Sequence, residues 1–182
     1  GNQSIGLGSL SSAVGTYSTA VGHRSQAFGE SASAYGALAR AYGANGVALG
    51  AGALVSNSKA LTKAEYDALP EEEKALYHTE NIKQDDYYQY KQKTDSGKIE
   101  DIEVNGVAIG NYARSIGFGG VAIGDHAKAS DEDNIENSKW GVALGAYSQN
   151  KVQQGVAIGI LSVADREKDS MGYLPTTGKA IE

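Results

Sequence analysis

The chain has 182 residues, of which 24 are glycine and only two are proline, and its formal charge is −6 at pH 7. This acidic balance, with no basic stripe, argues against nucleic acid as a partner. Because the chain has no cysteine, it offers no disulfide, thiolate metal site or cysteine nucleophile. No apolar run approaches the roughly 20 residues of a membrane-spanning helix.

The first segment, residues 1–56, is organised around a seven-residue repeat. Glycine recurs there at positions 8, 15, 22, 29, 36, 43 and 50. Glycine at every seventh place would cost a helix about 1 kcal/mol each time, so each unit is expected to be a short strand plus a turn whose glycine takes a positive φ. Two units, about 14 residues, would complete one turn of a flattened solenoid with two faces.

Strand alternation divides the side chains of each unit between two sides. Within one copy, Val47 and Leu49 lie on one side and Ala48 on the other. We expect the larger aliphatic side chains to fill the narrow interior. The side that carries the small residues would allow another backbone to approach closely. One buried aliphatic residue gives about 1.5–3 kcal/mol, whereas every ordered residue loses about 1–2 kcal/mol of backbone entropy. The solenoid is therefore expected to need oligomerisation or capping.

The second segment, residues 57–104, breaks the repeat and is predicted to be an insertion. Pro70 followed by three glutamates predicts the first turn of a short helix, the second of a helical hairpin. Residues 87–93 and 99–104 are expected to pair as a β-hairpin around a turn signal at 94–97. The insertion would thus be a helical hairpin plus a β-hairpin that projects from the solenoid.

The third segment, residues 105–164, resumes the repeat. A Val-Ala-Ile-Gly or Val-Ala-Leu-Gly unit begins at positions 107, 121, 142 and 156. These spacings are multiples of seven, so the polar stretch at 129–140 is expected to loop out without shifting the register. Residues 165–182 lose the repeat and are expected to form a cap or connector.

Four aromatic residues are candidates for contact with a partner: Tyr87, Tyr88, Tyr90 and Trp140. The three tyrosines alternate between the faces of a predicted strand, so one surface cannot bury all of them. Tyrosine offers a large rigid area with a polar tip, which suits interfaces. These tyrosines are expected either to contact a partner or to pack the insertion onto the solenoid, and Trp140 to pin the neighbouring acidic loop.

The chain lacks the residue patterns of an enzyme or a metal protein. His23, His78 and His126 are far apart in sequence, and His126 is expected on a solvated turn. The carboxylates at 71–73 and 131–136 lack the spacing of calcium loops, and no nucleophile elbow or phosphate loop is found. We predict no catalytic, cofactor-binding or metal-binding residue. One alternative is left open: if three copies of the chain meet on an axis, one inward histidine from each copy could together form an ion site.

The repeated units resemble the head repeats of trimeric autotransporter adhesins, the YadA-like class; the best copies are residues 46–50, 106–110, 120–124, 141–145 and 155–159. The resemblance implies an all-β solenoid, a left-handed parallel β-roll in each chain of a homotrimer. It implies a surface adhesin of the outer membrane of a Gram-negative bacterium, with the export signal and membrane anchor outside this stretch. It also implies attachment to a host receptor or a matrix protein of collagen, fibronectin or CEACAM type.

One tripeptide and two alternative families qualify this resemblance. Phe118-Gly119-Gly120 matches a tripeptide that marks an inserted hairpin elsewhere in the class, but the seven-residue step continues through it, so an ordinary repeat is expected. A left-handed β-helix acyltransferase remains open, although a seven-residue period and the lack of a well-placed histidine count against it. A phage tail-fibre segment is favoured only by residues 61–74.

Overall fold

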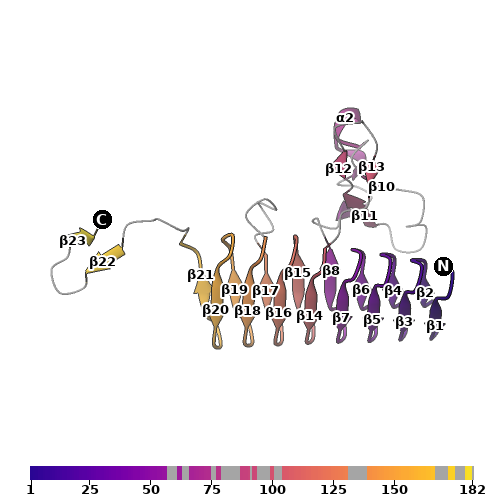
Figure 1. Cartoon of the computed structure of the whole chain (residues 1–182), viewed down its shortest axis with the longest axis horizontal. Coiled ribbons are helices and arrows are strands. Elements are labelled where there is room, and N and C mark those ends of the chain that lie inside the picture. The colour runs from indigo at the N-terminus through magenta and orange to yellow at the C-terminus, as the bar shows by residue number, and fades with distance from the viewer. Residues whose placement is uncertain are drawn as a thin grey trace.

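Two parallel sheets form the main body of the molecule, a flattened roll (Figure 1). The computed structural model describes residues 1–56, 61–62, 66–74, 77–78, 87–90, 92–93, 99–100, 104–130, 139–166, 172–174 and 179–181. Sheet A contains, in spatial order, β1 (Ile5–Leu7), β3 (Thr19–Val21), β5 (Ser33–Tyr35), β7 (Val47–Leu49), β14 (Val107–Ile109), β16 (Val121–Ile123), β18 (Val142–Leu144) and β20 (Val156–Ile158). Sheet B contains β2 (Ser12–Ala13), β4 (Gln26–Ala27), β6 (Arg40–Ala41), β8 (Leu54–Ser56), β15 (Arg114–Ile116), β17 (Lys128–Ala129), β19 (Gln149–Asn150) and β21 (Val163–Ala164).

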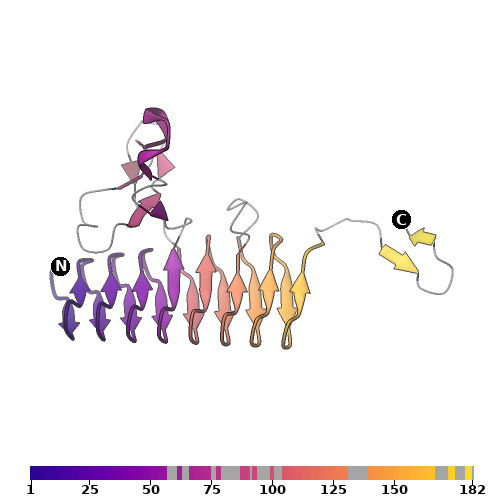
Figure 2. The same ribbon diagram turned by 180° about the vertical axis from the view of Figure 1, so that it is seen from behind.

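Each coil of the roll contributes one strand to sheet A and one to sheet B. The register confirms the predicted coil, because Ile5 pairs with Thr19, 14 positions later. In sheet B, Ser12 pairs with Gln26 over the same interval. Successive coils therefore stack as parallel strands along the length of the roll, as the view from behind also shows (Figure 2).

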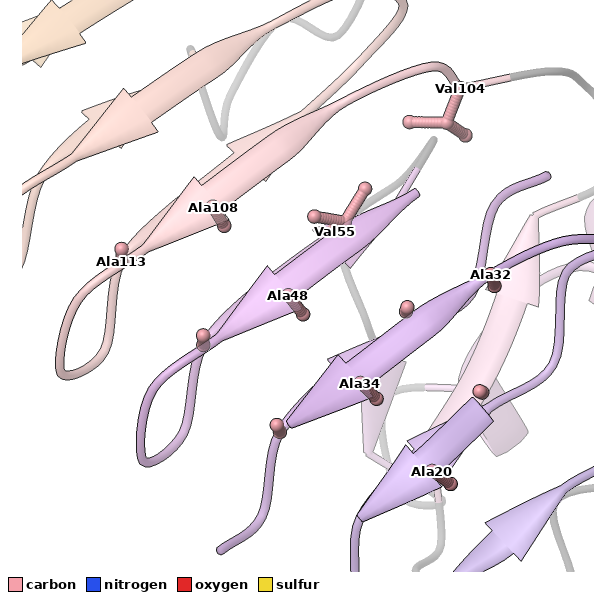
Figure 3. Close-up of a cluster of buried hydrophobic side chains, with 12 residues drawn as sticks. Ala20, Ala32, Ala34, Ala48, Val55, Val104, Ala108 and Ala113 are labelled. Carbon is pink, nitrogen blue, oxygen red and sulfur yellow. The ribbon is translucent and has the colours of Figure 1, made fainter. Parts of the chain in front are cut away.

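The interior of the roll is filled by alanine, so the prediction of an aliphatic interior was wrong. Ala20, Ala34 and Ala48, at the centres of sheet A strands, are fully buried, and their side chains point into the roll (Figure 3). Leu49 instead points outward and is 46% exposed. The alternation of large and small residues along a strand does not by itself determine which of them point into the roll. The interior is narrow, since a Cβ added at Gly46 would lie 2.9 Å from the Val55 side chain, so most inward positions hold small side chains.

The insertion interrupts the sequence of the roll but not its sheets. Val47 of β7 pairs directly with Val107 of β14, 60 positions later, and Leu54 of β8 pairs with Arg114 of β15. The Asn45 amide nitrogen also donates a 3.0 Å hydrogen bond to the side-chain oxygen of Asn105 across the same junction. The two halves of the repeat therefore form one continuous roll.

Short elements are described within the insertion and the tail. The strands β12 (Gln92–Lys93) and β13 (Ile99–Glu100) pair antiparallel, which confirms the predicted β-hairpin for these residues. Residues 87–90, predicted to belong to the same hairpin, pair with other strands instead. Another antiparallel sheet joins β10 (Tyr77–His78), β11 (Tyr87–Tyr90) and β9 (Leu61–Thr62), and the tail pairs β22 (Gly172–Leu174) with β23 (Lys179–Ile181).

Helix is confined to a small part of the described chain. The helix α2 (Glu71–Lys74) confirms the prediction of a helical turn after Pro70, and the Lys74 ammonium lies 2.8 Å from the Glu71 carboxylate. The helical hairpin, the handedness of the roll and the three-chain assembly remain predictions. Among the described residues, no helix has the length and apolar character needed to cross a bilayer.

Candidate functional site

The outer face of sheet A is a charge-free apolar surface, which we call the apolar face. It consists of the two outward residues of each strand: Ile5, Leu7, Thr19, Val21, Ser33, Tyr35, Val47, Leu49, Val107, Ile109, Val121, Ile123, Val142, Leu144, Val156 and Ile158. Seven of these side chains are among the large exposed hydrophobic residues, and Ile158 reaches 68% exposure. A contiguous exposed surface of this kind marks an interaction site.

The outer face of sheet B is different in chemistry. Its outward positions carry Arg40, Arg114 and Lys128 on strands that are neighbours or near neighbours in the sheet. Charged and polar side chains are the ordinary covering of a surface in contact with water. The two faces of the roll are therefore chemically distinct, and only the outer face of sheet A lacks charge.

Turns form the two long edges of the roll and have a regular conformation. We call the turns that run from sheet A to sheet B the leading edge, and those that run from sheet B to sheet A the return edge. Every turn of the leading edge holds a residue with φ between 51° and 65°, namely Leu10, Arg24, Leu38, Gly52, Tyr112, His126, Tyr147 and Leu161. The return edge has the corresponding residues Gln3, Tyr17, Ser31, Asn45, Asn105, Gly119, Trp140 and Gln154.

Every turn glycine of the leading edge is confirmed at positive φ, whereas on the return edge Gly117 and Gly119 have positive φ but Gly15, Gly29 and Gly43 do not. Gly36, for example, has φ of +128°, and an added Cβ would lie 2.6 Å from the carbonyl oxygen of Gly50 in the next coil. Two positions after each such glycine comes the residue in the left-handed region. Sequence analysis missed these residues because leucine and tyrosine are rare in that conformation.

Three leading-edge side chains stack in successive coils. The ring of Tyr112 lies 5.3 Å from that of His126, and the His126 ring lies parallel to that of Tyr147 at 4.9 Å. The turns are held in line by backbone hydrogen bonds of 2.8 Å, such as the one from the Tyr147 N–H to the Asp125 carbonyl. Both tyrosines remain about half exposed. The prediction that His126 lies on a turn is confirmed, although its ring is sandwiched between two others.

A carboxylate is held beside this stack. The Asn111 side-chain amide donates a 3.0 Å hydrogen bond to Asp125, and the His126 Nδ1 lies 3.1 Å from the same carboxylate oxygen. The hydrogen bond from Asn111 is the main cause that lowers the pKa of Asp125, followed by the contact with His126. Asp125 is therefore a fixed negative charge on the leading edge at neutral pH.

Trp140 lies on the return edge, where it contacts the roll. Its ring packs edge-on against Phe118 with ring centres 4.8 Å apart, and its backbone N–H donates to the Phe118 carbonyl. A Cβ at Gly119 would collide with the indole ring, so glycine gives the ring its space. The strands on either side, β15 and β16, keep their register, which confirms an ordinary repeat at Phe118-Gly119-Gly120.

The other predicted contact residues cannot be compared with this surface. Tyr87, Tyr88 and Tyr90 belong to β11, and their side chains lie outside the described residues, as does the acidic loop at 131–138. Among the residues that the structure describes, no three His, Asp or Glu side chains come close enough together to hold a metal ion.

Comparison with protein families connects the roll to a known repeat. The family model described as "YadA head domain repeat (2 copies)" matches residues 1–25, 13–39, 27–53 and 115–133. Residues 1–53 and 115–133 are therefore repeats of the YadA head type. The matches lie on both sides of the insertion and coincide with the stacked coils, so the resemblance inferred from the sequence is confirmed. A search of curated proteins returned no match to the chain.

The YadA family explains the division of the molecule's surface. YadA head repeats belong to adhesins of the trimeric autotransporter type, a class that is not enzymatic. In this roll the alanine interior, the apolar face and the two turn edges are all built by the same repeat. The functional surface is therefore sought on the outside of the roll, because side chains fill its interior.

Proposed function

We propose that this chain is the head of a bacterial surface adhesin that assembles from three copies and attaches to host tissue. The observation that carries the assembly is the apolar face, which spans the eight strands of sheet A and on which a single chain leaves large hydrophobic side chains exposed on five strands, β1, β5, β7, β16 and β20. The match to the YadA head repeat supports the adhesive role. On this proposal the head has no enzymatic activity and is displayed on the outer membrane of a Gram-negative bacterium.

Three copies side by side would bury the apolar face on a common axis. A Val, Leu or Ile side chain that is fully buried contributes about 1.5–3 kcal/mol, and each chain presents one or two such side chains on every strand of sheet A except β5, which presents Tyr35. The charged positions of sheet B would then lie on the side that faces away from the axis. This arrangement buries the charge-free surface and leaves the surface that carries charge outside.

Adhesion would come from the outward surfaces, repeated three times. The partner on this proposal is a host receptor or a matrix protein, of which collagen, fibronectin and CEACAM-type receptors are the candidates. Three equivalent sites on one rigid head raise the overall strength of attachment through effective concentration, even when each contact is weak.

The insertion is proposed as one of these outward surfaces. We divide the chain into head repeats at 1–56 and 105–164, an insertion at 57–104, and a cap or connector at 165–182. Tyr87, Tyr88 and Tyr90 remain the candidate contacts within the insertion, and Trp140 a further one on the roll. Deleting residues 57–103 should leave the roll intact, because β7 already pairs with β14 across the junction.

Two measurements test the function. Sedimentation equilibrium should give the mass of three chains; a folded monomer at micromolar concentration would refute the assembly. Beads coated with the purified head should adhere to host cells or to a panel of matrix proteins and receptors, whereas beads coated with heat-unfolded protein should not. Failure to bind any member of the panel and any host cell line would refute the adhesive role.

A further inference from the structure

We propose that the insertion, residues 57–103, packs against an apolar patch on the outer face of sheet B. This patch consists of Phe28, Tyr42, Leu54 and Ile116, which cluster together, and we call it the outer patch. The inference deepens the proposed function, on which its adhesive meaning rests, because it places the insertion on the side of the roll opposite the apolar face.

The residues of the outer patch point away from the interior of the roll. Their neighbours Ala27, Ala41 and Val55 belong to the buried core, and successive residues of a strand point to opposite faces of the sheet. The N–H of Phe28 donates to the carbonyl of Ala41, as in a strand, so the alternation continues one residue beyond β4. The outer patch therefore lies on the outside of sheet B, where water would reach it on a bare two-sheet roll.

The outer patch is nevertheless buried. Ile116 is 1% exposed, Tyr42 5% and Leu54 6%, whereas Val163, an outward residue at the end of the same sheet, is 49% exposed. The Tyr42 hydroxyl donates a 2.7 Å hydrogen bond to the Gln26 side-chain oxygen, and Gln26 is buried as well. The coils do not supply the cover, because their chain passes directly from one sheet to the other. A further layer of chain therefore lies over this part of sheet B.

The insertion begins and ends beside the outer patch. It leaves the roll after Ser56, which pairs with Ile116 on the neighbouring strand, and returns at Val104, whose side chain would collide with a Cβ at Gly43. From Ser56 to Leu61 of β9 the chain covers five positions, at most about 18 Å at 3.6 Å per residue. Figure 1 shows β10 and β11, which belong to the same sheet as β9, level with β6 and β8 along the roll.

Two other segments of the chain match the outer patch less well. The loop at 131–138 has eight residues, four of them acidic, which suits water rather than an apolar surface. It leaves from β17, four strand spacings or about 19 Å from β4, and its backbone must go out and return within about 32 Å. The tail strands β22 and β23 lie beyond β21, past the end of the roll (Figure 1). The insertion is the segment that fits in position, length and composition.

Packing on the outer patch determines where the insertion would be displayed. Sheet B is the layer of the roll opposite the apolar face. In an assembly that buries the apolar face on its axis, each insertion would lie on the outside, on the side open to a host surface. A segment that is already anchored loses less conformational freedom when it binds a partner than a free segment does.

Thiol labelling measures the cover directly, because the chain has no cysteine of its own. In the full chain, Ile116→Cys should react with a thiol reagent at pH 8 about 100-fold more slowly than Val163→Cys, since buried thiols are unreactive. In a variant in which one glycine replaces residues 57–103, the two rates should agree within about threefold. That glycine takes the place of Gly43 in the preceding coil. Circular dichroism shows whether each variant is folded.

A second test keeps the full chain. Tyr42→Asp places a carboxylate beneath the insertion, two strands away from Ile116. Since burial of an unpaired carboxylate is unfavourable, this change should release the insertion and speed the labelling of Ile116→Cys about 10- to 100-fold. Val163→Asp is the matched control on the same sheet and should not alter the labelling rate. This comparison decides the question by itself if the glycine variant does not fold.

Three results would overturn the inference. They are fast labelling of Ile116→Cys in the full chain, slow labelling that persists after residues 57–103 are replaced, and a labelling rate that Tyr42→Asp leaves unchanged. Persistent protection would assign the cover to the loop at 131–138, the tail or a second copy of the chain. The adhesion assay is separate: a head that shows the expected labelling but binds no host cell would keep the packing of the insertion and lose the adhesive role.

Discussion

Replacing Leu49 by alanine or aspartate tests whether the apolar face holds the chains together. Leu49 lies near the middle of the roll, in line with Tyr35 and Ile109 on the adjacent strands. In the single chain 46% of the residue is exposed, so association can remove about half of the leucine surface from water. At about 1.5–3 kcal/mol for full burial of a leucine, that share is worth roughly 1 kcal/mol per chain.

Because three chains change at once, the effect triples. Leu49→Ala should cost the trimer about 3 kcal/mol, which weakens the trimer–monomer equilibrium roughly 100-fold at 1.4 kcal/mol per factor of ten. Leu49→Asp should abolish the trimer at micromolar concentration, because three carboxylates would meet in an apolar environment. Sedimentation equilibrium measures both changes.

A matched position on the other sheet provides the control. Val163 in β21 is 49% exposed, close to the value for Leu49, but it belongs to sheet B. Val163→Asp should leave the trimer mass unchanged. If Leu49→Asp remains a trimer, or if Val163→Asp dissociates it, then sheet A does not face the axis and the reasoning from the apolar face is refuted.

Three further changes test the inside of the roll and its edge. Gly36→Ala should lower the melting temperature more than Gly159→Ala, because both glycines have positive φ but only the Cβ at position 36 meets a neighbouring backbone; equal losses would contradict this. Gly141→Ala should be strongly destabilising by itself and nearly neutral when combined with Asn150→Ala, since the added Cβ collides only with the Asn150 side chain; additive losses in a double-mutant cycle would refute that coupling. Asp125 has a lowered pKa, so its contribution to stability is full above its unfolded pKa of about 3.9 and disappears as the pH falls through the folded value. The melting temperatures of the native chain and of Asp125→Asn should therefore differ at pH 6 and converge by pH 2; a constant difference would be inconsistent with the lowered pKa.

The repeat could be predicted from the sequence because glycine is physically required at fixed places. Gly15 and Gly29 sit directly against the backbone of the next coil, where any Cβ would collide. Because each coil requires glycine at the same contact, glycine recurs at a fixed interval in the sequence. That interval predicts how many residues one coil contains. The continuity of the roll across the insertion followed from the same period, because the coils on either side carry the same unit.

The orientation of the strands could not be predicted, since Val47, Ala48 and Leu49 alternate in the same way whichever side is inside. The distance between the sheets decides the question, and that distance is a property of the stacked coils rather than of any one unit. The stack of Tyr112, His126 and Tyr147 was missed for a related reason. These residues lie 14 and 21 positions apart, and only the register that includes the loop at 131–138 places their rings together.

The alanine interior has a consequence for how such a head changes in length. Since alanine occupies the inward position of sheet A in seven of its eight strands, a coil can be added or removed on that side without new side-chain complementarity. Each sheet has eight strands, hence seven intervals, and at about 4.8 Å per interval the roll measures roughly 34 Å. The length of the roll therefore changes only in whole steps of one strand spacing, and each step corresponds to a duplication of 14 residues. Duplication or loss of coils could thus change the length of the molecule with the core chemistry held constant.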